Sequence, residues 1–392
     1  MIRYLTAGES HGPALVVVVE GLPAGLGYRW RTSRVSWADA GSATAGARMR
    51  FEQDDVAIRG GVRHGRTLGS PVAIEVANTE WTRNPEKWGT EMSVRAEDGP
   101  RGPRSPAPAR SCRPGRHAKY GFTDARDVLE RASARETAAR VAAGTLAKLL
   151  LRSIGVEIIS HVLQLGSVRS KATARPGPAD LATVDGSEVR CFDQAAEDAM
   201  VEEIKAAAKD GDSLGGVVEV LAYDVPVGLG SHVHWDRKLD GLLACALMSI
   251  QAVKGVEIGE GFDVAGRRGS AAHDPITWDA AAGYQRGGSR AGGIEGGMST
   301  GELIVAHVAM KPLATLNKPT LKTVDVLTKA ESVSFKERTD VTAVPAMGVV
   351  AETMCALVLA DEVTRKFGGD SVGELVGNCN RFLGGLEDGP LG

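Results

Sequence analysis

Two stretches of this chain are apolar around whole helical turns, and they restrict the possible folds more than any other feature. Leu239–Val253 and Ala346–Phe367 keep apolar residues on most sides of a helix, which predicts helices that are largely buried. A helix of this kind belongs either to the core of a large protein or to a membrane. No apolar run approaches the roughly 20 residues of a membrane span. We therefore expect core helices and no membrane partner.

The rest of the chain alternates helical and extended patterns. Glu130–Ile154 is rich in alanine and leucine at helical spacing, Gln194–Lys209 is amphipathic, and Lys366–Gly369 ends the last apolar helix with a cation and a glycine. Short β-branched runs predict five strands, at Ala14–Glu20, Pro71–Ala77, Val156–Leu163, Gly216–Ala222 and Leu303–Val308.

Composition excludes several classes of protein. The 392 residues are 43% hydrophobic and 24% charged, which is enough apolar material for a large core and favours one domain over residues 1–392. The net charge of −3 creates no field that attracts nucleic acid. Five scattered cysteines and an N-terminus without a secretory signal indicate the cytoplasm, without disulfides or zinc.

A glycine-rich motif around His11 and an arginine-rich motif around Arg131 are candidates for catalysis or ligand binding. His11 lies within Gly8–Gly12 just before an apolar strand, where it is exposed enough to donate a proton; the alternative is a structural histidine. Arg131 and Arg135 lie at the start of the long predicted helix, where small neighbours leave room for a phosphate. The alternative is a surface pair bonded to nearby glutamates.

Two later motifs place charged groups at strand ends. Lys311–Thr315 follows a predicted buried strand and brings an ammonium and a hydroxyl to its end. Arg338 and Asp340 share one face of an extended segment, so that the cation is expected to keep the carboxylate ionised, unless the two form a surface ion pair. His232–Trp235 resembles a metal-binding pair, but no third ligand is spaced nearby, and we expect no metal.

Six motifs, four of which are described above, resemble in order and over nearly the full chain the signatures of chorismate synthases of high-GC Gram-positive bacteria. The resemblance implies an α+β fold, a single-domain β-α-β sandwich, and a homotetramer. It also implies an anti-1,4 elimination of phosphate from 5-enolpyruvylshikimate 3-phosphate, with reduced FMN as a cofactor that is not consumed. The motifs are Gly8–Gly12, Arg131–Arg140, Ile250–Gly259, Ala291–Gly297, Met310–Thr315 and Arg338–Pro345.

The resemblance also implies roles for individual residues. His11 corresponds to the histidine that protonates the departing phosphate, and Asp340 to the carboxylate that helps the flavin accept the C6 proton. Arg48, Arg135 and Arg338 correspond to the arginines that neutralise the phosphate and carboxylates of the substrate. The implied flavin contacts are Arg131, Ala132, Ser133, Gln251, Ala252, Gly296, Lys311, Pro312, Leu313, Ala314, Thr315 and Arg338.

Two segments, near residues 27–47 and 94–118, depart from the family and show no helix or strand period. The family's arginine-rich loop is replaced by Asp39–Ala45, and its Arg-Pro-Gly-His-Ala-Asp motif by Ala107–Ala118, where His117 is displaced. Suitable synonymous codons, read in another frame, restore both motifs. Local reading-frame shifts, in the gene or in its sequencing, are therefore our hypothesis for both segments.

Two other classes of protein stay open at this stage. One is a catalytically weakened or inactive flavoprotein of the same fold, although His11, Arg135 and Asp340 are retained. The other is an oxidoreductase with net flavin chemistry. The residues also leave open whether the protein reduces its own flavin with NADPH or depends on an external reductant.

Overall fold

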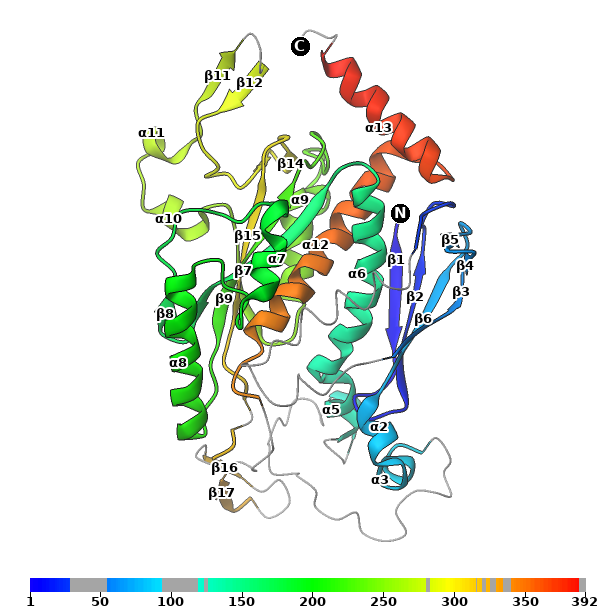
Figure 1. Ribbon diagram of the computed structural model, residues 1–392, viewed down its shortest axis with the longest axis vertical. Helices are drawn as coiled ribbons and strands as arrows, with labels where there is room; N and C mark the ends of the chain where they lie inside the picture. Colours follow the sequence, from blue (N-terminus) through cyan, green and yellow to red (C-terminus); the bar gives the residue numbers. More distant parts are fainter. Residues whose placement is uncertain are drawn as a thin grey trace.

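The computed structural model describes residues 1–28, 55–93, 119–122, 126–279, 283–314, 316–318, 322–324, 329–333 and 340–387. Two antiparallel sheets form its framework (Figure 1). The first has the strand order β1 (Arg3–Ala7), β2 (Ala14–Glu20), β6 (Val72–Ala77) and β3 (Val56–Gly60). The second has the order β10 (Val253–Ile258), β15 (Ile304–Met310), β9 (Gly216–Tyr223), β7 (Glu157–Leu165) and β8 (Val168–Arg169).

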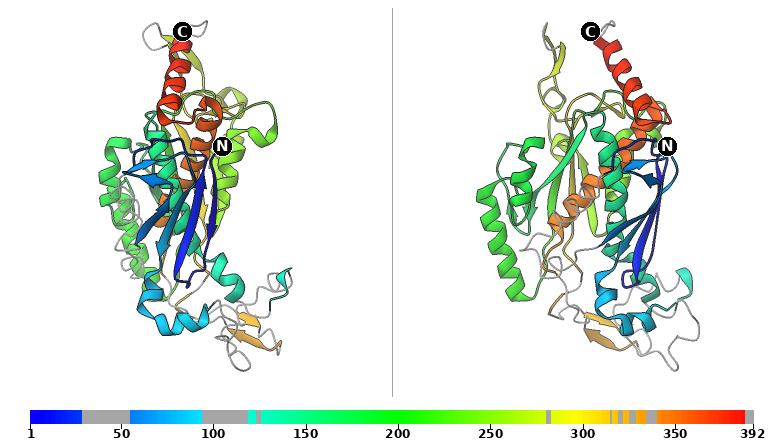
Figure 2. Two further views of the ribbon diagram at one scale, coloured as in Figure 1. Left: turned by 90° about the vertical axis from the view of Figure 1, so that its right-hand side faces the viewer. Right: turned by 45° about the vertical axis from the view of Figure 1, so that its right-hand side comes forward.

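Two helices fill the space between these sheets. Helix α6 (Thr137–Arg152) packs against β2 and β6 of the first sheet, and α12 (Val344–Phe367) packs against β7 and β9 of the second. The helices also pack extensively against each other, and Figure 2 shows both of them behind the first sheet. The expected α+β fold and its β-α-β layering are confirmed.

The contact between the two central helices is unusually close at one point. A Cβ atom added to Gly144 of α6 would lie 2.3 Å from Cβ of Thr353 on α12, well inside van der Waals contact. Helix α12 is long and apolar enough to cross a membrane by composition, but 83% of its most apolar window is buried inside the protein. It is therefore a core helix, as its sequence predicted.

The five predicted strands are all present, with ends that differ by at most two residues. Strand β2 is β-branched as predicted, and its side chains alternate between a buried and an outward face. Leu15, Val17 and Val19 are buried against the helices, whereas Val16 and Val18 face outward. The predicted helix at 194–209 corresponds to α8 (Gln194–Asp210), and Gly368 ends α12 with a φ of +61°.

Two helix predictions were wrong in extent. The predicted helix Glu130–Ile154 is interrupted at Ser133, which adopts an extended conformation and accepts a hydrogen bond from the Arg135 amide. Helix α5 (Arg126–Ala132) ends before this break, and the 3₁₀ turn η2 (Ala134–Glu136) after it leads into α6. The predicted helix Leu239–Val253 ends early, as α9 (Leu239–Met248), because the chain turns through Ala252 with a φ of +67° into β10. Only one face of α9 is buried.

Smaller elements surround the sandwich, and one hydrophobic cluster joins both sheets through the central helices. The prediction of a single domain over residues 1–392 stays a prediction, and nearly all of segments 27–47 and 94–118 lies outside the described residues. The smaller elements are α2 (Thr79–Arg83), α3 (Pro85–Glu91), α7 (Leu181–Gly186), α10 (Gly261–Ala265), α11 (Gly269–Ala272), α13 (Val372–Glu387), η3 (Pro178–Asp180), η4 (Trp235–Arg237), β4 (Val62–Arg63), β5 (Arg66–Thr67), β11 (Ile276–Asp279), β12 (Gly283–Arg286), β13 (Ile294–Glu295), β14 (Met298–Ser299), β16 (Lys322–Val324) and β17 (Glu331–Val333).

Candidate active site

Several loops and helix ends gather at the end of the sandwich drawn at the bottom of Figures 1 and 2. The loop after β1 lies there together with α2, α3, α5 and the start of α6. The turn after α9 joins them because Gln251 donates a hydrogen bond to Glu136 at the start of α6. His11, Arg131, Ser133, Arg135 and Gln251 lie on these segments.

His11 is held in one orientation by a buried carboxylate and an aromatic ring. Its Nδ1 atom lies 2.9 Å from Oε1 of Glu130, and its backbone N–H donates to Oε2 of the same carboxylate over 2.8 Å. The imidazole stacks on Trp88 with ring centroids 4.2 Å apart. Within the described part of the chain no hydrogen bond engages Nε2, and about a quarter of the side chain is exposed. The ring is therefore fixed on one edge and accessible on the other.

Glu130 is ionised despite its burial. Removal from water opposes its charge, but the hydrogen bonds from His11 and the charge of Arg126 outweigh this effect, so the pKa of Glu130 lies below its ordinary value. The ionised carboxylate is an acceptor only, so it keeps a proton on Nδ1 of His11.

The loop that carries His11 is itself fixed. Nδ2 of Asn78 donates to the carbonyl oxygens of Ser10 and Gly12, over 2.7 and 3.0 Å. Oγ of Ser10 donates to Oγ of Ser133, and the Ser10 amide donates to the Glu130 carbonyl. Gly8 has a φ of +104°, and a Cβ there would meet the Ala14 carbonyl oxygen at 2.5 Å, so the tight turn requires glycine.

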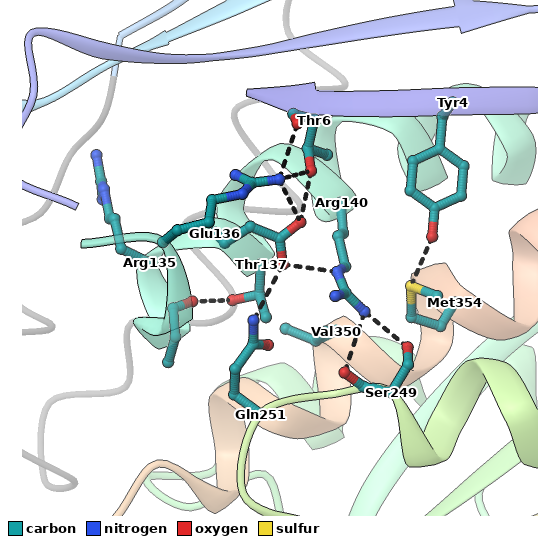
Figure 3. Close-up of polar contacts among 12 residues, drawn as sticks. Tyr4, Thr6, Arg135, Glu136, Thr137, Arg140, Ser249, Gln251, Val350 and Met354 are labelled. Carbon is teal, nitrogen blue, oxygen red and sulfur yellow. Dashed lines mark hydrogen bonds and ion pairs between the residues drawn. The ribbon is translucent and has the colours of Figure 1, made fainter. Parts of the chain in front are cut away.

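A second buried carboxylate, Glu136, organises the neighbouring surface (Figure 3). It accepts hydrogen bonds from Thr6 Oγ1 (2.7 Å), Arg140 Nε (2.8 Å) and Gln251 Nε2 (3.1 Å), and Nη2 of Arg131 lies 3.8 Å away. Burial opposes its charge, yet these donors lower the pKa of Glu136. The group borders a cavity of about 330 Å³, lined by Tyr4, Leu5, Thr6, Arg131, Glu136, Arg140, Ser249 and Gln251.

Hydrogen bonds continue from this cavity to the end of β15. The Lys311 amide donates to the Ala252 carbonyl oxygen over 3.0 Å, which places the lysine beside the turn that carries Gln251. Farther along, the Leu313 carbonyl accepts a hydrogen bond from Ser213, and the Leu214 amide donates to the carbonyl of Val341, the residue after Asp340. Pro312 and Ala314 are exposed on the same segment.

The structure brings some of the predicted site residues together and leaves others apart. His11, Arg131, Ser133 and Gln251 share one network, Ala132 is exposed beside it, and Lys311 adjoins it through Ala252. Arg135 points away from Glu136 and donates to the Ala77 carbonyl over 3.1 Å (Figure 3). Arg48, Thr315 and Arg338 lie outside the described residues.

Gly296 lies apart from this network. It is exposed between β13 and β14, beside Gly297, whose carbonyl oxygen accepts a hydrogen bond from the first residue of α9. Gln251 follows the opposite end of that helix, which has 10 residues and a length of about 15 Å at 1.5 Å per residue. The role of Gly296 stays a prediction.

Sequence reasoning missed several residues that shape the site. Trp88, Asn78 and Arg140 were not singled out, and Glu130 and Glu136 were noted only as neighbours of arginines. The one available signal was Asn78, an N-cap residue directly after a strand and before α2. No group of three or more metal-ligating side chains occurs in the described ranges.

Comparison with known proteins identifies the class. A model of the family described as chorismate synthase matches residues 2–364. Chorismate synthases from Salinispora tropica and Thermobifida fusca are each 54% identical to this chain, over 398 and 405 residues, covering 98% of it and 99% of each relative. A crystal structure of chorismate synthase superimposes with a TM-score of 0.77, at 35% identity over 99% of both chains.

The fold and these matches together define an enzyme, a carbon–oxygen lyase of the shikimate pathway. The chain belongs to the chorismate synthase family.

Proposed function

We propose that this chain eliminates phosphate from 5-enolpyruvylshikimate 3-phosphate in an anti-1,4 sense, giving chorismate, with reduced FMN bound beside the substrate. The observation that carries the proposal is the fixed imidazole of His11, whose Nδ1 edge is held by ionised Glu130. We further propose one domain, a homotetramer, and the cytoplasm as its location.

His11 acts as the general acid toward the leaving phosphate. Glu130 and Trp88 orient the ring, so that Nε2 is the atom that faces the ligand. When the ring carries a second proton, that proton lies on Nε2 and is transferred to a phosphate oxygen as the C–O bond breaks. Placing an acid in this way contributes about 10² to 10⁴ in rate.

The residues around the cavity fit a flavin in their chemistry. Arg131 and Gln251 line the cavity and offer cationic and amide donors of the kind that bind a ring edge or a phosphate. Lys311 adjoins Gln251 through Ala252, and Ala132 and Ala252 are small residues next to these donors. Ala252 is a non-glycine residue in the left-handed region, a strain that is commonly found at functional sites. When bound, reduced FMN supplies electron density to the allylic system of the substrate.

The remaining assignments follow the resemblance. We propose that Arg135 and Lys311 neutralise anionic groups of the ligands, with Arg48 and Arg338 completing the substrate side. Asp340 then serves as the carboxylate that helps to receive the C6 proton. It is half-buried, and its neighbour Val341 accepts a hydrogen bond from Leu214, which lies just before β9.

The test is chorismate formation by the purified full chain under anaerobic conditions with chemically reduced FMN. We expect turnover in the wild type and a rate about 10² to 10⁴ lower for His11→Ala, with FMN affinity unchanged. A His11→Ala variant that retains wild-type kcat would remove His11 from the mechanism. Replacing the chemical reductant by NADPH tests whether the chain reduces its own flavin.

The second candidate is a weakened flavoprotein of the same fold, favoured by the missing arginines at Asp39–Ala45. It predicts FMN binding with little or no chorismate formation by the chain as written. A variant carrying the family motifs in both aberrant segments would then regain activity. Equal rates of the two forms would reject this candidate. Substrate-dependent anaerobic oxidation of the flavin would instead indicate a net oxidoreductase.

A further inference from the structure

Glu136 lies where three separate parts of the chain meet, yet no resemblance or sequence pattern gave it a role. It belongs to the turn before α6 and contacts Thr6 at the end of β1, Arg140 on α6 and Gln251 after α9. Arg140 extends the link, because Nη1 donates to Oγ of Ser249 over 2.8 Å. A single carboxylate thereby ties the first sheet and the central helix to the turn that precedes β10.

The charges around the cavity are unequal in number. Among the described residues that line it, Arg131 and Arg140 contribute two positive charges and Glu136 one negative charge, which leaves one positive charge over. A cavity with this balance favours an anion or an electron-rich ring over a cation. The carboxylate therefore does not cancel the attraction for an anionic ligand, but it fixes the direction of the donors.

Gln251 illustrates this positioning. Its Nε2 atom is held by Glu136, and its backbone leads directly into Ala252, whose left-handed conformation carries the Lys311 contact. Arg131 is oriented in a similar way, by the Thr6 carbonyl oxygen at 2.8 Å and by Glu136 at 3.8 Å. Both side chains belong to the proposed flavin contacts, and the buried carboxylate of Glu136 contacts both of them.

We propose that Glu136 is a positioning residue for the cofactor side of the site, which sets Gln251 and Arg131 in the geometry that binds FMN. The inference rests on the proposed function, because it assigns the cavity to the flavin. Glu136 is 6% exposed, so it acts through its neighbours rather than as a catalytic residue. Preorganised contacts of this kind raise affinity by removing the cost of ordering side chains on binding.

The variant Glu136→Gln removes the charge and keeps the shape. One carboxylate oxygen accepts from Thr6 and the other from both Arg140 and Gln251. In one orientation the new amide N–H₂ faces the Arg140 and Gln251 donors; in the other it faces Thr6 and the guanidinium of Arg131. The Nε atom of Arg140 cannot accept, so the first orientation leaves it without this acceptor. The second orientation keeps an oxygen for Arg140 and Gln251 but removes the ion pair with Arg131, which keeps its hydrogen bond to the Thr6 carbonyl oxygen.

The experiment is a double-mutant cycle in FMN affinity, measured by quenching of flavin fluorescence on the full chain, with Glu136→Gln, Gln251→Ala and the double variant. We expect Glu136→Gln to raise the Kd for FMN about tenfold in the wild type, but less than threefold in the Gln251→Ala background. Glu157→Gln is the matched control, since Glu157 pairs with the half-exposed Arg152 and borders no described part of the cavity.

The outcomes separate the possibilities. Equal fold-changes in both backgrounds, or an unchanged Kd, would overturn the inference while leaving the proposed function intact. If the wild type itself binds no FMN, the flavin assignment and this inference both fail. If circular dichroism shows that Glu136→Gln does not fold, Glu136→Asp, which keeps the charge but withdraws the carboxylate, decides the question by the same cycle.

Discussion

Two buried carboxylates on the central layer of the sandwich have similar partners and very different surroundings. Glu352, in the middle of α12, accepts hydrogen bonds from Lys148 Nζ (2.6 Å), Ser160 Oγ (2.7 Å) and Arg190 Nη2 (3.1 Å). Glu136 likewise accepts from an arginine, a hydroxyl and a nitrogen donor, but it borders a cavity. Similar sets of hydrogen-bond donors thus surround one carboxylate in the core and another beside a cavity.

The comparison separates a charged cluster expected to stabilise the fold, around Glu352, from one expected to bind a ligand, around Glu136. In the core, Arg190 is 2% exposed, and its guanidinium pairs with Glu352 and Asp185. At the cavity, one positive charge is left over and faces an opening. We therefore expect substitutions in the first cluster to change the free energy of unfolding, and substitutions in the second to change ligand binding and rate.

The largest expected effect is on stability, from Glu352→Ala. The change leaves Lys148 buried without its carboxylate and Arg190 with Asp185 as its remaining carboxylate partner, and breaking a buried ion pair in this way costs about 3–5 kcal/mol. Denaturant unfolding would measure the loss, with Glu157→Gln as the exposed control. A loss below about 1 kcal/mol would mean that the core cluster contributes no more than a surface pair.

The next effect is catalytic, from Glu130→Gln. Loss of the ionised partner frees the His11 ring to rotate and to change its tautomer, and removal of an orienting partner of this kind commonly costs about 10- to 100-fold. We expect this decrease in kcat with a nearly constant KM. In the His11→Ala background the same change should have almost no further effect. An equal decrease in both backgrounds would show that Glu130 acts only on folding.

The third effect is the response of the core cluster to acid. Burial opposes the charge of Glu352, but Lys148 and Arg190 outweigh it, so the folded-state pKa lies below the unfolded one. Stability from this group is therefore complete above the unfolded pKa of about 4.3, and is lost as the pH falls toward the folded value. The slope approaches about 1.4 kcal/mol per pH unit. Glu352→Gln should flatten the decline between pH 5 and pH 3; an unchanged slope would contradict the assignment.

Much of the fold followed from patterns within short windows of sequence. The strands β2, β9 and β15 were predictable because β-branched residues cluster in them, and α12 because apolar residues surround it. The break at Ser133 was missed. A single serine in an alanine-rich stretch is compatible both with the interior of a helix and with an N-cap, so the sequence pattern does not distinguish the two. The early end of α9 was missed because Ile250 and Val253 continue its apolar pattern.

The site was predictable only where a motif carried it. His11, Arg131 and Gln251 were recognised by their motifs, but the partners that orient them lie far away in the chain, as Glu130 does from His11 at a separation of 119 residues. The stack of Trp88 on His11 depends on how α3 docks against the loop after β1, and no local pattern encodes that docking. Such pairs arise from tertiary packing alone.

The close approach at Gly144 has a consequence far from the place where it occurs. Helix α6 packs on the first sheet and α12 on the second, and the two helices approach closely because no side chain separates Gly144 from Thr353. His11 lies in the loop between β1 and β2 of the first sheet, and Lys311 directly follows β15 of the second sheet. We therefore expect that a methyl group at residue 144 would push the two helices apart and shift His11 relative to Lys311, which would lower activity although neither residue is changed.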